Sequence, residues 1–466
     1  METTAPSARG RGRSPSLAAL LSFLWPGLGQ LYLRNRRLAA IFAVPSLVVV
    51  LLLAYGLRRG PVVFAADLFA NRVFGLAAIA VLLLFGAWRL ASVVLAFLGG
   101  GGSKTSRIVD RAVLAGLAAV IAVTHLGSGF YLLAVSNGVS PIFSSPNPSF
   151  IDLTTPVPSP NSSGGAGPGP TTVATPSINS RVTILFTGFD SAPGRGETLY
   201  DSLLIVSYDP ASNSVQMLSV PRDSTSFPLY FGKHVVVPTW LRINSIPTNV
   251  QKGGIAGSPD SPYMTLVNEV SYLAGIHIDY YAAMDLNGFV KMIDSVGGID
   301  VVNPAVINDG NYDWLNGAPY GFYLAAGPQH LDGMHALAYV RSRKSAGDND
   351  FGRSSRQQQV LVALLHKMAQ PDQILNLPNL ISTLGSSVST DFPADRVADY
   401  IAIGQNIPSE NFKHVVLDPS AGYSEYLPSG ALCLFNSRVA DESVTLFGQD
   451  SLWYNKPVPA NTCPAS

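Results

Sequence analysis

Two apolar runs joined by a polar turn, Ser202-Leu-Leu-Ile-Val-Ser-Tyr-Asp-Pro-Ala-Ser-Asn-Ser-Val-Gln-Met-Leu-Ser-Val220, decide the fold of the larger part of this 466-residue chain. The runs 202–208 and 214–220 have the length and composition of strands, and 209–213 carries the Asp, Pro, Ser and Asn typical of a turn. A similar apolar run, 181–189, precedes them. The stretch therefore predicts three consecutive strands.

Helix-like and strand-like patterns alternate after this stretch. Apolar spacing predicts helices over 261–274, 287–296, 331–339 and 356–368, and strands over 280–286 and 299–302. Strands and helices mixed in this order are typical of an α/β fold. We expect a layered αβα domain with a central mixed sheet and helices on both faces.

The N-terminal third has a different composition. Stretches 38–57, 73–98 and 112–135 are apolar and long enough to cross a bilayer as helices, although Arg89 lies inside the second. The stretch 17–33 is shorter and is broken by Trp25-Pro-Gly-Leu-Gly-Gln30, so it is either a re-entrant segment or a fourth span. A helical transmembrane region is therefore expected before the α/β domain.

Basic residues bear on the topology. Basic residues cluster before 17–33, between 17–33 and 38–57, and before 112–135; they are Arg9, Arg11, Arg13, Arg34, Arg36, Arg37, Lys104, Arg107 and Arg111. If all three clusters are cytoplasmic, three spans place the chain after residue 135 outside the cytoplasm. Four spans with a cytoplasmic N-terminus would place it inside. Cys433 and Cys463 favour the outside, where they are either a disulfide worth about 3 kcal/mol or two buried thiols. We expect a multi-pass cell-membrane protein with an extracytoplasmic C-terminal domain.

Residues 136–181 contain nine prolines and five glycines and hardly a charge, which is typical of an extended tether. The expected organisation is a membrane region over 1–135, this linker over 136–181, the α/β domain over 182–370 and a C-terminal extension over 371–466. The net charge of zero argues against nucleic acid as a partner.

The densest group of charged residues is Tyr339–Gln359, which holds four arginines within 21 residues of a protein that is 13% charged. Arginine side chains bind phosphate oxygens in pairs, so several converging arginines make an anion pocket. A solvated helix surface with salt bridges is the alternative. No Cys or His spacing of a zinc site and no G-x-S-x-G nucleophile motif occurs in the sequence.

Further charged residues follow the predicted strands. Asp190 ends the first strand, Asp201 opens the second, and Arg222 with Asp223 ends the third, before Asn244 in a later loop. Loops beyond strand ends are where sheets of this kind gather ligand-binding side chains. Carboxylates with nearby arginines suit a Mg²⁺–pyrophosphate ligand, because the metal takes oxygen ligands and the arginines neutralise the remaining charge.

The order of these motifs resembles the LytR-CpsA-Psr family of envelope glycopolymer ligases over about 190 residues, from Arg181 to roughly Gln370. The matching runs are Leu185-Phe-Thr-Gly-Phe-Asp190, Asp201-Ser-Leu-Leu-Ile-Val-Ser, Leu218-Ser-Val-Pro-Arg-Asp223, Arg242-Ile-Asn244, Ile278-Asp-Tyr-Tyr, Val296-Gly-Gly-Ile-Asp-Val301, His330-Leu-Asp-Gly, Tyr339-Val-Arg-Ser-Arg and Asp350-Phe-Gly-Arg-Ser-Ser-Arg-Gln-Gln-Gln359.

The resemblance implies a membrane-anchored extracytoplasmic phosphotransferase that uses Mg²⁺. It would move a glycopolymer phosphate from a polyprenyl-pyrophosphate carrier to a hydroxyl of peptidoglycan. The roles it implies are metal binding by Asp190 and Asp201, pyrophosphate binding by Arg222, Arg341, Arg343, Arg353 and Gln357, catalysis by Asp350 and Arg222, and support of the site by Asp223 and Asn244.

One position departs from the family pattern. Leu199 stands two residues before Asp201, where the family commonly has an arginine, and Arg195 is a candidate substitute. Two other functions remain open: a polyprenyl-pyrophosphate hydrolase that uses water as the acceptor, and a non-catalytic envelope protein that binds lipid or glycan.

Overall fold

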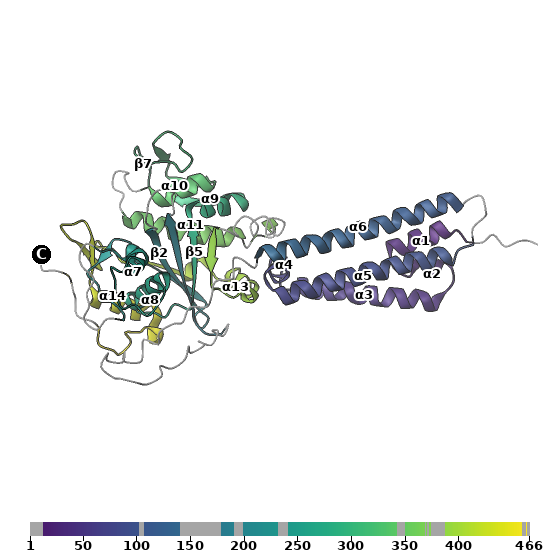
Figure 1. The fold of residues 1–466 in the computed structure, drawn as a ribbon, viewed down its shortest axis with the longest axis horizontal. Helices are drawn as coiled ribbons and strands as arrows, with labels where there is room; N and C mark the ends of the chain where they lie inside the picture. The colour runs from purple at the N-terminus through teal and green to yellow at the C-terminus, as the bar shows by residue number, and fades with distance from the viewer. Residues whose placement is uncertain are drawn as a thin grey trace, which may run out of the picture. The chain divides into compact units, whose positions relative to one another are not determined.

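The computed structural model describes residues 13–101, 107–139, 179–190, 199–231, 241–342, 350–368, 370, 372–373, 387–458 and 463. The chain divides into two compact units, Met1–Gly138 and Val139–Ser466 (Figure 1). Most of the predicted linker lies outside the described residues. Arg195 and Arg343 also lie outside them.

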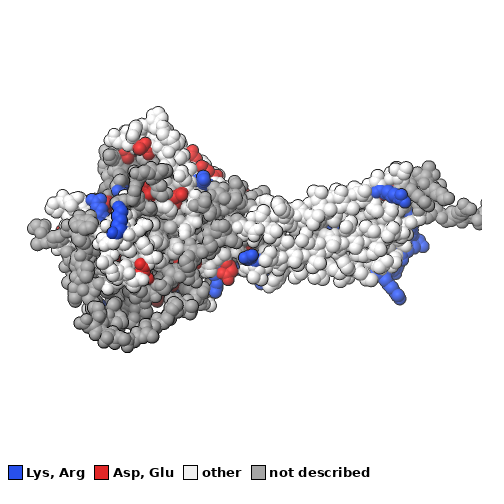
Figure 2. Space-filling model, viewed as in Figure 1, with Lys and Arg blue, Asp and Glu red and all other residues white. Residues whose placement is uncertain are grey.

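The first unit is helical. Its elements are α1 (Pro15–Leu24), α2 (Leu28–Tyr32), α3 (Arg36–Leu57), α4 (Pro61–Ala70), α5 (Arg72–Leu98) and α6 (Arg107–Val139). Helices α3, α5 and α6 are long and apolar enough to cross a membrane, with mean hydropathies of 2.6, 2.2 and 1.8. Figure 2 shows arginines at one end of this unit and an almost uncharged surface along its length. These three helices support the expected membrane anchoring.

Helices α1 and α2 form a short hairpin, in which the start of α1 lies next to the end of α2. The guanidinium of Arg13, before α1, donates to the carbonyl of Tyr32 at the end of α2. Ten residues of α1 rise only about 15 Å, too little to cross a bilayer. Gly27 in the turn has a φ of 101°, and a Cβ there would lie 2.4 Å from the Ala39 carbonyl oxygen. The stretch 17–33 therefore forms a short helical hairpin, and its re-entrant placement stays a prediction.

The second unit is built on a six-stranded sheet in the order β10-β5-β1-β2-β3-β11. Its strands are β1 (Val182–Asp190), β2 (Leu199–Asp209), β3 (Ser214–Ser219), β5 (Tyr280–Asp285), β10 (Val388–Thr390) and β11 (Phe412–Val416). β5 lies parallel to β1 and β11 parallel to β3, whereas the remaining neighbours are antiparallel. The expected central mixed sheet is confirmed.

Helices cover both faces of this sheet (Figure 1). One face packs on α7 (Ile246–Gln251), α8 (Pro262–Ala274) and α14 (Asn436–Phe447) through a core that includes Leu185, Ile205 and Leu266. The other packs on α11 (Asp350–Met368) and α13 (Val397–Gly404) through Leu204 and Met217. Helices α9 (Leu286–Ser295) and α10 (Gly333–Arg341) join α11 in a further core. The expected layered αβα fold is confirmed.

Smaller strand pairs surround the sheet. β6 (Ile299–Asn303) pairs with β9 (Gly327–Leu331), and β7 (Ile307–Asp309) pairs with β8 (Phe322–Leu324). β13 (Leu432–Leu434) lies between β12 (Ser424–Tyr426) and β4 (Ser224–Thr225).

The segment after residue 370 is part of this fold. It supplies both edge strands of the main sheet, β10 and β11, together with β13 beside β4. A disulfide joins Cys433 to Cys463 with their Cα atoms 5.6 Å apart, which decides between the two states expected for these cysteines. The boundary expected at residue 370 therefore falls within one continuous sheet rather than between two domains.

Glu269 of α8 is a fully buried acid within this core. One carboxyl oxygen accepts a hydrogen bond from the backbone N–H of Tyr230 at 3.1 Å. Burial raises the pKa of Glu269 to about 8, and the bond from Tyr230 only partly offsets this. The folded protein therefore holds a proton that the unfolded chain releases near pH 4.5.

The substitution Glu269→Gln should flatten the pH dependence of stability. Because the folded-state pKa is raised, Glu269 makes the wild type progressively less stable as the pH rises from about 4.5 to about 8. Between pH 4.5 and about 8, the unfolding temperature of the variant should therefore rise increasingly above that of the wild type. Glu410→Gln, at an exposed position, is the control and should track the wild type. Parallel curves for Glu269→Gln and wild type would contradict this assignment.

Candidate functional site

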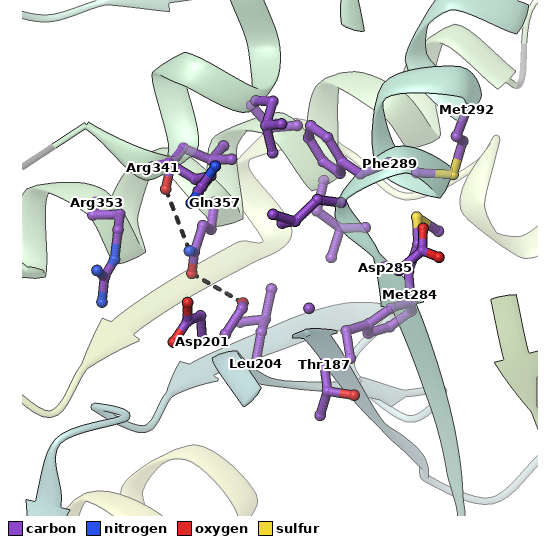
Figure 3. Close-up of a pocket in the computed structure, with 18 of the residues that line it drawn as sticks. Thr187, Asp201, Leu204, Met284, Asp285, Phe289, Met292, Arg341, Arg353 and Gln357 are labelled. Atoms are coloured by element: carbon purple, nitrogen blue, oxygen red, sulfur yellow. Dashed lines mark hydrogen bonds between the residues drawn. The ribbon is translucent and has the colours of Figure 1, made fainter. Parts of the chain in front are cut away.

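A cavity of about 460 Å³ lies between the main sheet and helices α9, α10 and α11. Figure 3 shows Arg341, Arg353, Gln357 and Asp201 towards one part of it and Phe289, Met292 and Met284 towards another. Its lining is therefore polar at one end and mainly apolar elsewhere, although the carboxylate of Asp285 lies beside Met284. The apolar side chains include Phe186, Leu204, Phe289, Met292, Leu337, Val360, Leu361, Leu364, Leu365 and Met368.

A β-bulge places Asp201 at the polar end. Gly188 pairs with Ser202 and Phe189 pairs with Tyr200, so Asp201 is an extra residue on β2 without a partner position on β1. Successive side chains on a regular strand point to opposite faces, whereas a bulge turns the local backbone. As a result, the neighbours Asp201 and Ser202 both line the cavity.

Arg222 connects two carboxylates beside the cavity. Its Nη1 donates to Oδ1 of Asp201, and its Nε lies 3.5 Å from Oδ2 of Asp223. Arg242 donates to the other oxygen of Asp223 at 2.6 Å. Asp223 is thus held by two arginines and does not line the cavity. Of these four residues, Asp201 and Arg222 are the ones available to a ligand there.

The loop that carries Arg222 is supported by the C-terminal part of the chain. The backbone N–H of Leu432 donates to the carbonyl of Asp223 at 3.0 Å, and β13 pairs with β4 directly after this loop. Cys433, in the same strand, forms the disulfide with Cys463. Asn244 also contacts this loop, because its backbone N–H donates to the carbonyl of Arg222 at 3.3 Å. Asn244 is buried and is absent from the cavity lining.

Arg341 is the last residue of α10 and faces the end of β1. Its Nη2 lies 3.9 Å from Oδ2 of Asp190, which is itself buried. A cation at a helix C-terminus also interacts favourably with the helix dipole. Half-exposed Arg341 lines the cavity, so its guanidinium is accessible from inside it.

Helix α11 contributes Arg353 and Gln357, which are four residues apart and therefore on one helix face. Oε1 of Gln357 accepts from the hydroxyl of Ser202 at 3.0 Å, and its Nε2 is 3.5 Å from the carbonyl oxygen of Val340 (Figure 3). Gln357 thereby connects α11 to both β2 and α10. Arg353 is largely buried and lines the same cavity.

Arg356 has a different role from the other arginines of this cluster. Its Nε donates to the carbonyl of Tyr339 and its Nη2 to that of Ser342, each at 2.6 Å. These carbonyls lie at the C-terminal end of α10, where the helix leaves acceptors without internal partners. The buried Arg356 therefore fixes α10 to α11, whereas Arg341 and Arg353 face the cavity.

The β7–β8 pair adds residues that the sequence patterns did not reveal. Asp309, Asn311, Tyr312 and Asp313 line the cavity. Oδ2 of the buried Asp309 accepts from the hydroxyl of Ser342 at 2.9 Å. Burial raises the pKa of Tyr312, so its hydroxyl stays protonated near neutral pH. The strands of this hairpin are only three residues long and twelve residues separate them, so the strand pattern in the sequence is weak here.

Helix α11 begins at Asp350, six residues before the predicted start. Gly352 lies in the additional first turn, where a single glycine costs a helix only about 1 kcal/mol. Asp350 lies one turn before Arg353 on the same helix.

Arg343 and Arg195 lie outside the described residues. Leu199 pairs with Asp190 in the β1–β2 register, so an arginine at this position would lie next to the site.

The acidic residues suit a metal only together with a ligand. Among the described residues, no group of three His, Cys, Asp or Glu side chains has the arrangement of a metal site. Mg²⁺ commonly binds one or two carboxylates and completes its shell with water and substrate phosphates. Asp201 lines the cavity, whereas Asp190 is buried and absent from its lining, so metal binding by these two carboxylates stays a prediction.

Known proteins match this chain over its second unit. The model of the LytR_cpsA_psr family matches residues 162–430. The polyisoprenyl-teichoic acid–peptidoglycan teichoic acid transferase TagV of Bacillus subtilis is 30% identical over 226 residues, which are 48% of this chain and 52% of TagV. TagU of Bacillus mycoides, with the same descriptive name, is 29% identical over 218 residues, 47% of this chain and 62% of TagU.

The matched part thus spans between about half and two thirds of the length of these relatives. The crystal structure of B. subtilis TagV is 26% identical with a TM-score of 0.47, and the comparison covers 60% of this chain and 99% of that one.

The structural role of Arg356 and the cavity-facing position of Arg341 predict different effects on the free energy of unfolding. Arg356→Gln should lower the free energy of unfolding by about 3 kcal/mol, because two buried carbonyls at the end of α10 lose a charged donor. Arg341→Gln should change it much less, since Arg341 is half-exposed and its one ion pair is long. Chemical denaturation of both variants measures the difference. Equal losses would show that Arg356 has no special structural role.

Proposed function

The chain belongs to the LytR-CpsA-Psr family, and we propose on that premise that it is a membrane-anchored extracytoplasmic phosphotransferase. It would move a glycopolymer phosphate from a polyprenyl-pyrophosphate carrier to a hydroxyl of peptidoglycan. The observation that carries this proposal is the single cavity with arginines at one end and a mainly apolar lining elsewhere.

This cavity matches the chemistry of a polyprenyl pyrophosphate. The pyrophosphate needs several cationic donors in a partly dry site, and Arg222, Arg341 and Arg353 supply them. The polyprenyl chain gains about 25 cal/mol for each Å² of apolar surface that it removes from water. The side chains of α9 and α11 offer such an apolar surface, so one cavity suits both parts of the lipid.

Arginine–carboxylate pairs preorganise the polar end. Arg222 is held by Asp201 and Asp223, and Arg341 lies near Asp190. An arriving pyrophosphate would share these guanidinium groups, while Asp190 and Asp201 would bind Mg²⁺ together with phosphate oxygens. The bound metal would supply further positive charge for the developing charge on phosphorus oxygens.

The proposed reaction exchanges one P–O bond for another. The acceptor hydroxyl oxygen attacks the phosphorus that bears the glycan, and the bond to the bridging oxygen breaks, so polyprenyl phosphate leaves. Arg341, Arg353 and Gln357 would hold the phosphates in line, which is the main requirement of phosphoryl transfer. Asp350, at the first residue of α11, is our candidate for accepting the proton of the hydroxyl.

Two features support an extracytoplasmic location. The disulfide between Cys433 and Cys463 suits an oxidising compartment. Three helices that can cross a membrane, with a re-entrant α1–α2 hairpin, would place the second unit opposite a cytoplasmic N-terminus. A reporter fused after residue 135 tests this location, and a cytoplasmic signal would exclude transfer to peptidoglycan.

A reconstituted reaction tests the function itself. The purified full-length protein would be incubated with Mg²⁺, a lipid-linked glycopolymer and peptidoglycan. We expect labelled glycan on peptidoglycan, and loss of transfer after chelation of Mg²⁺. Release of glycan phosphate without acceptor would instead indicate a hydrolase, and binding without turnover would indicate a non-catalytic anchor.

Arg341→Gln should reduce transfer about 10- to 100-fold, because one charged hydrogen bond to phosphate contributes roughly 1.5–3 kcal/mol. Arg438→Gln, at an exposed position on α14, is the matched control and should transfer at the wild-type rate. Unchanged transfer by Arg341→Gln would remove this arginine from the proposed site.

Ala282→Phe tests the apolar part of the cavity. Ala282 lines it from β5, and a phenyl ring there would occupy space that the polyprenyl chain needs. We expect weaker binding of a long-chain polyprenyl pyrophosphate with little change for a short-chain analogue. Equal effects on both analogues would mean that the chain binds elsewhere.

A further inference from the structure

Arg89 is a charged residue within an apolar helix that is long enough to cross a membrane. It lies in α5, about 13 Å along the helix axis from Leu98 and about 25 Å from Arg72. A charge at such a depth is costly in hydrocarbon and commonly marks a functional site or an ion pair. The contacts of Arg89 therefore decide what it does.

Arg89 contacts the tip of the α1–α2 hairpin. Its Nη2 donates to the carbonyl of Phe23 at 2.7 Å, and its guanidinium carbon lies 5.3 Å from the centre of the Phe23 ring. Phe23 is in the last turn of α1, where carbonyl groups lack partners within the helix. This contact satisfies one such carbonyl but uses only one of the five N–H donors of arginine.

Among the described residues of this unit, neither acidic side chain forms an ion pair with Arg89. The acidic residues, in ranges 13–101 and 107–138, are Asp67 and Asp110. Asp67 of α4 lies 3.6 Å from Nη1 of Arg59, and Asp110 in the first turn of α6 accepts from the hydroxyl of Ser16. Buried charges in proteins are normally paired. An anion from outside the chain would therefore stabilise Arg89.

A cavity of about 230 Å³ lies beside this guanidinium. Its lining combines apolar with polar side chains and consists of Phe23, Leu82, Arg89, Val120, Thr124, His125 and Ser128. Thr124 and Ser128 are exposed, so the cavity opens at the outer surface of the bundle. Gly86 lies against His125, which lets α5 and α6 approach closely.

We propose that this cavity binds the phosphate of a membrane lipid headgroup. The headgroup would enter laterally between α5 and α6, and Arg89 would donate to the phosphate oxygens. The hydroxyls of Thr124 and Ser128 belong to residues that line the same cavity. This site does not depend on the proposed transferase activity.

Native mass spectrometry of the full-length protein in an uncharged detergent tests this site. The probe is dioctanoyl phosphatidylglycerol, and the comparison lipid is dioctanoylglycerol, which has the same chains without phosphate. We expect wild type to bind the phosphate lipid at least about tenfold more tightly, as one lost charged hydrogen bond would imply. Arg89→Gln should abolish this preference, and Arg438→Gln, at an exposed position on α14, should retain it.

Ser128→Leu provides a second variant, because it fills the cavity from its exposed side and leaves the bond between Arg89 and Phe23 in place. It should also lose the preference for the phosphate lipid. Wild-type preference in Ser128→Leu or in Arg89→Gln would overturn the proposal and leave Arg89 as a cap of α1. Displacement of the bound lipid by millimolar inorganic phosphate would also contradict a lipid site.

Discussion

The hydrogen bonds from Arg356 to the carbonyls of Tyr339 and Ser342 hold the site together. They fix the end of α10 against α11, and these two helices carry Arg341 and Arg353. Without that junction, α10 and α11 would lose the two bonds that keep both guanidinium groups at one cavity. The charge of Arg356 is thus used within the protein, so that the other two can face a ligand.

The sheet positions the opposite wall by a similar local device. The bulge in β2 turns Asp201 and Ser202 towards the cavity, where Asp201 binds Arg222 and Ser202 binds Gln357. These contacts join β2 to the loop after β3 and to α11. Most of the polar groups at the site therefore have a partner before any ligand arrives. Such an arrangement lowers the entropic cost of binding, because few side chains need to be ordered anew.

Local patterns predicted much of this fold. The β2–β3 hairpin followed from its apolar runs and turn residues, and Asp190 and Arg222 were recognised at strand ends because strand boundaries are local features. The bulge at Asp201 was not predictable, since it depends on the pairing register with β1. The role of Arg356 also depends on tertiary contacts: consecutive residues of a helix differ by about 100° in direction, so Arg356 and Gln357 face different neighbours.

The disulfide has a consequence for the order in which the protein matures. β13 supports the loop of Arg222 through the bond from Leu432 to Asp223, and its neighbour Cys433 is joined to a cysteine 30 residues later. That covalent bond forms only after residue 463 has been made and has reached an oxidant. If the second unit is exported, oxidation is therefore the final step in securing one wall of the pocket. Until then, the strand that supports the loop of Arg222 lacks its covalent link to Cys463.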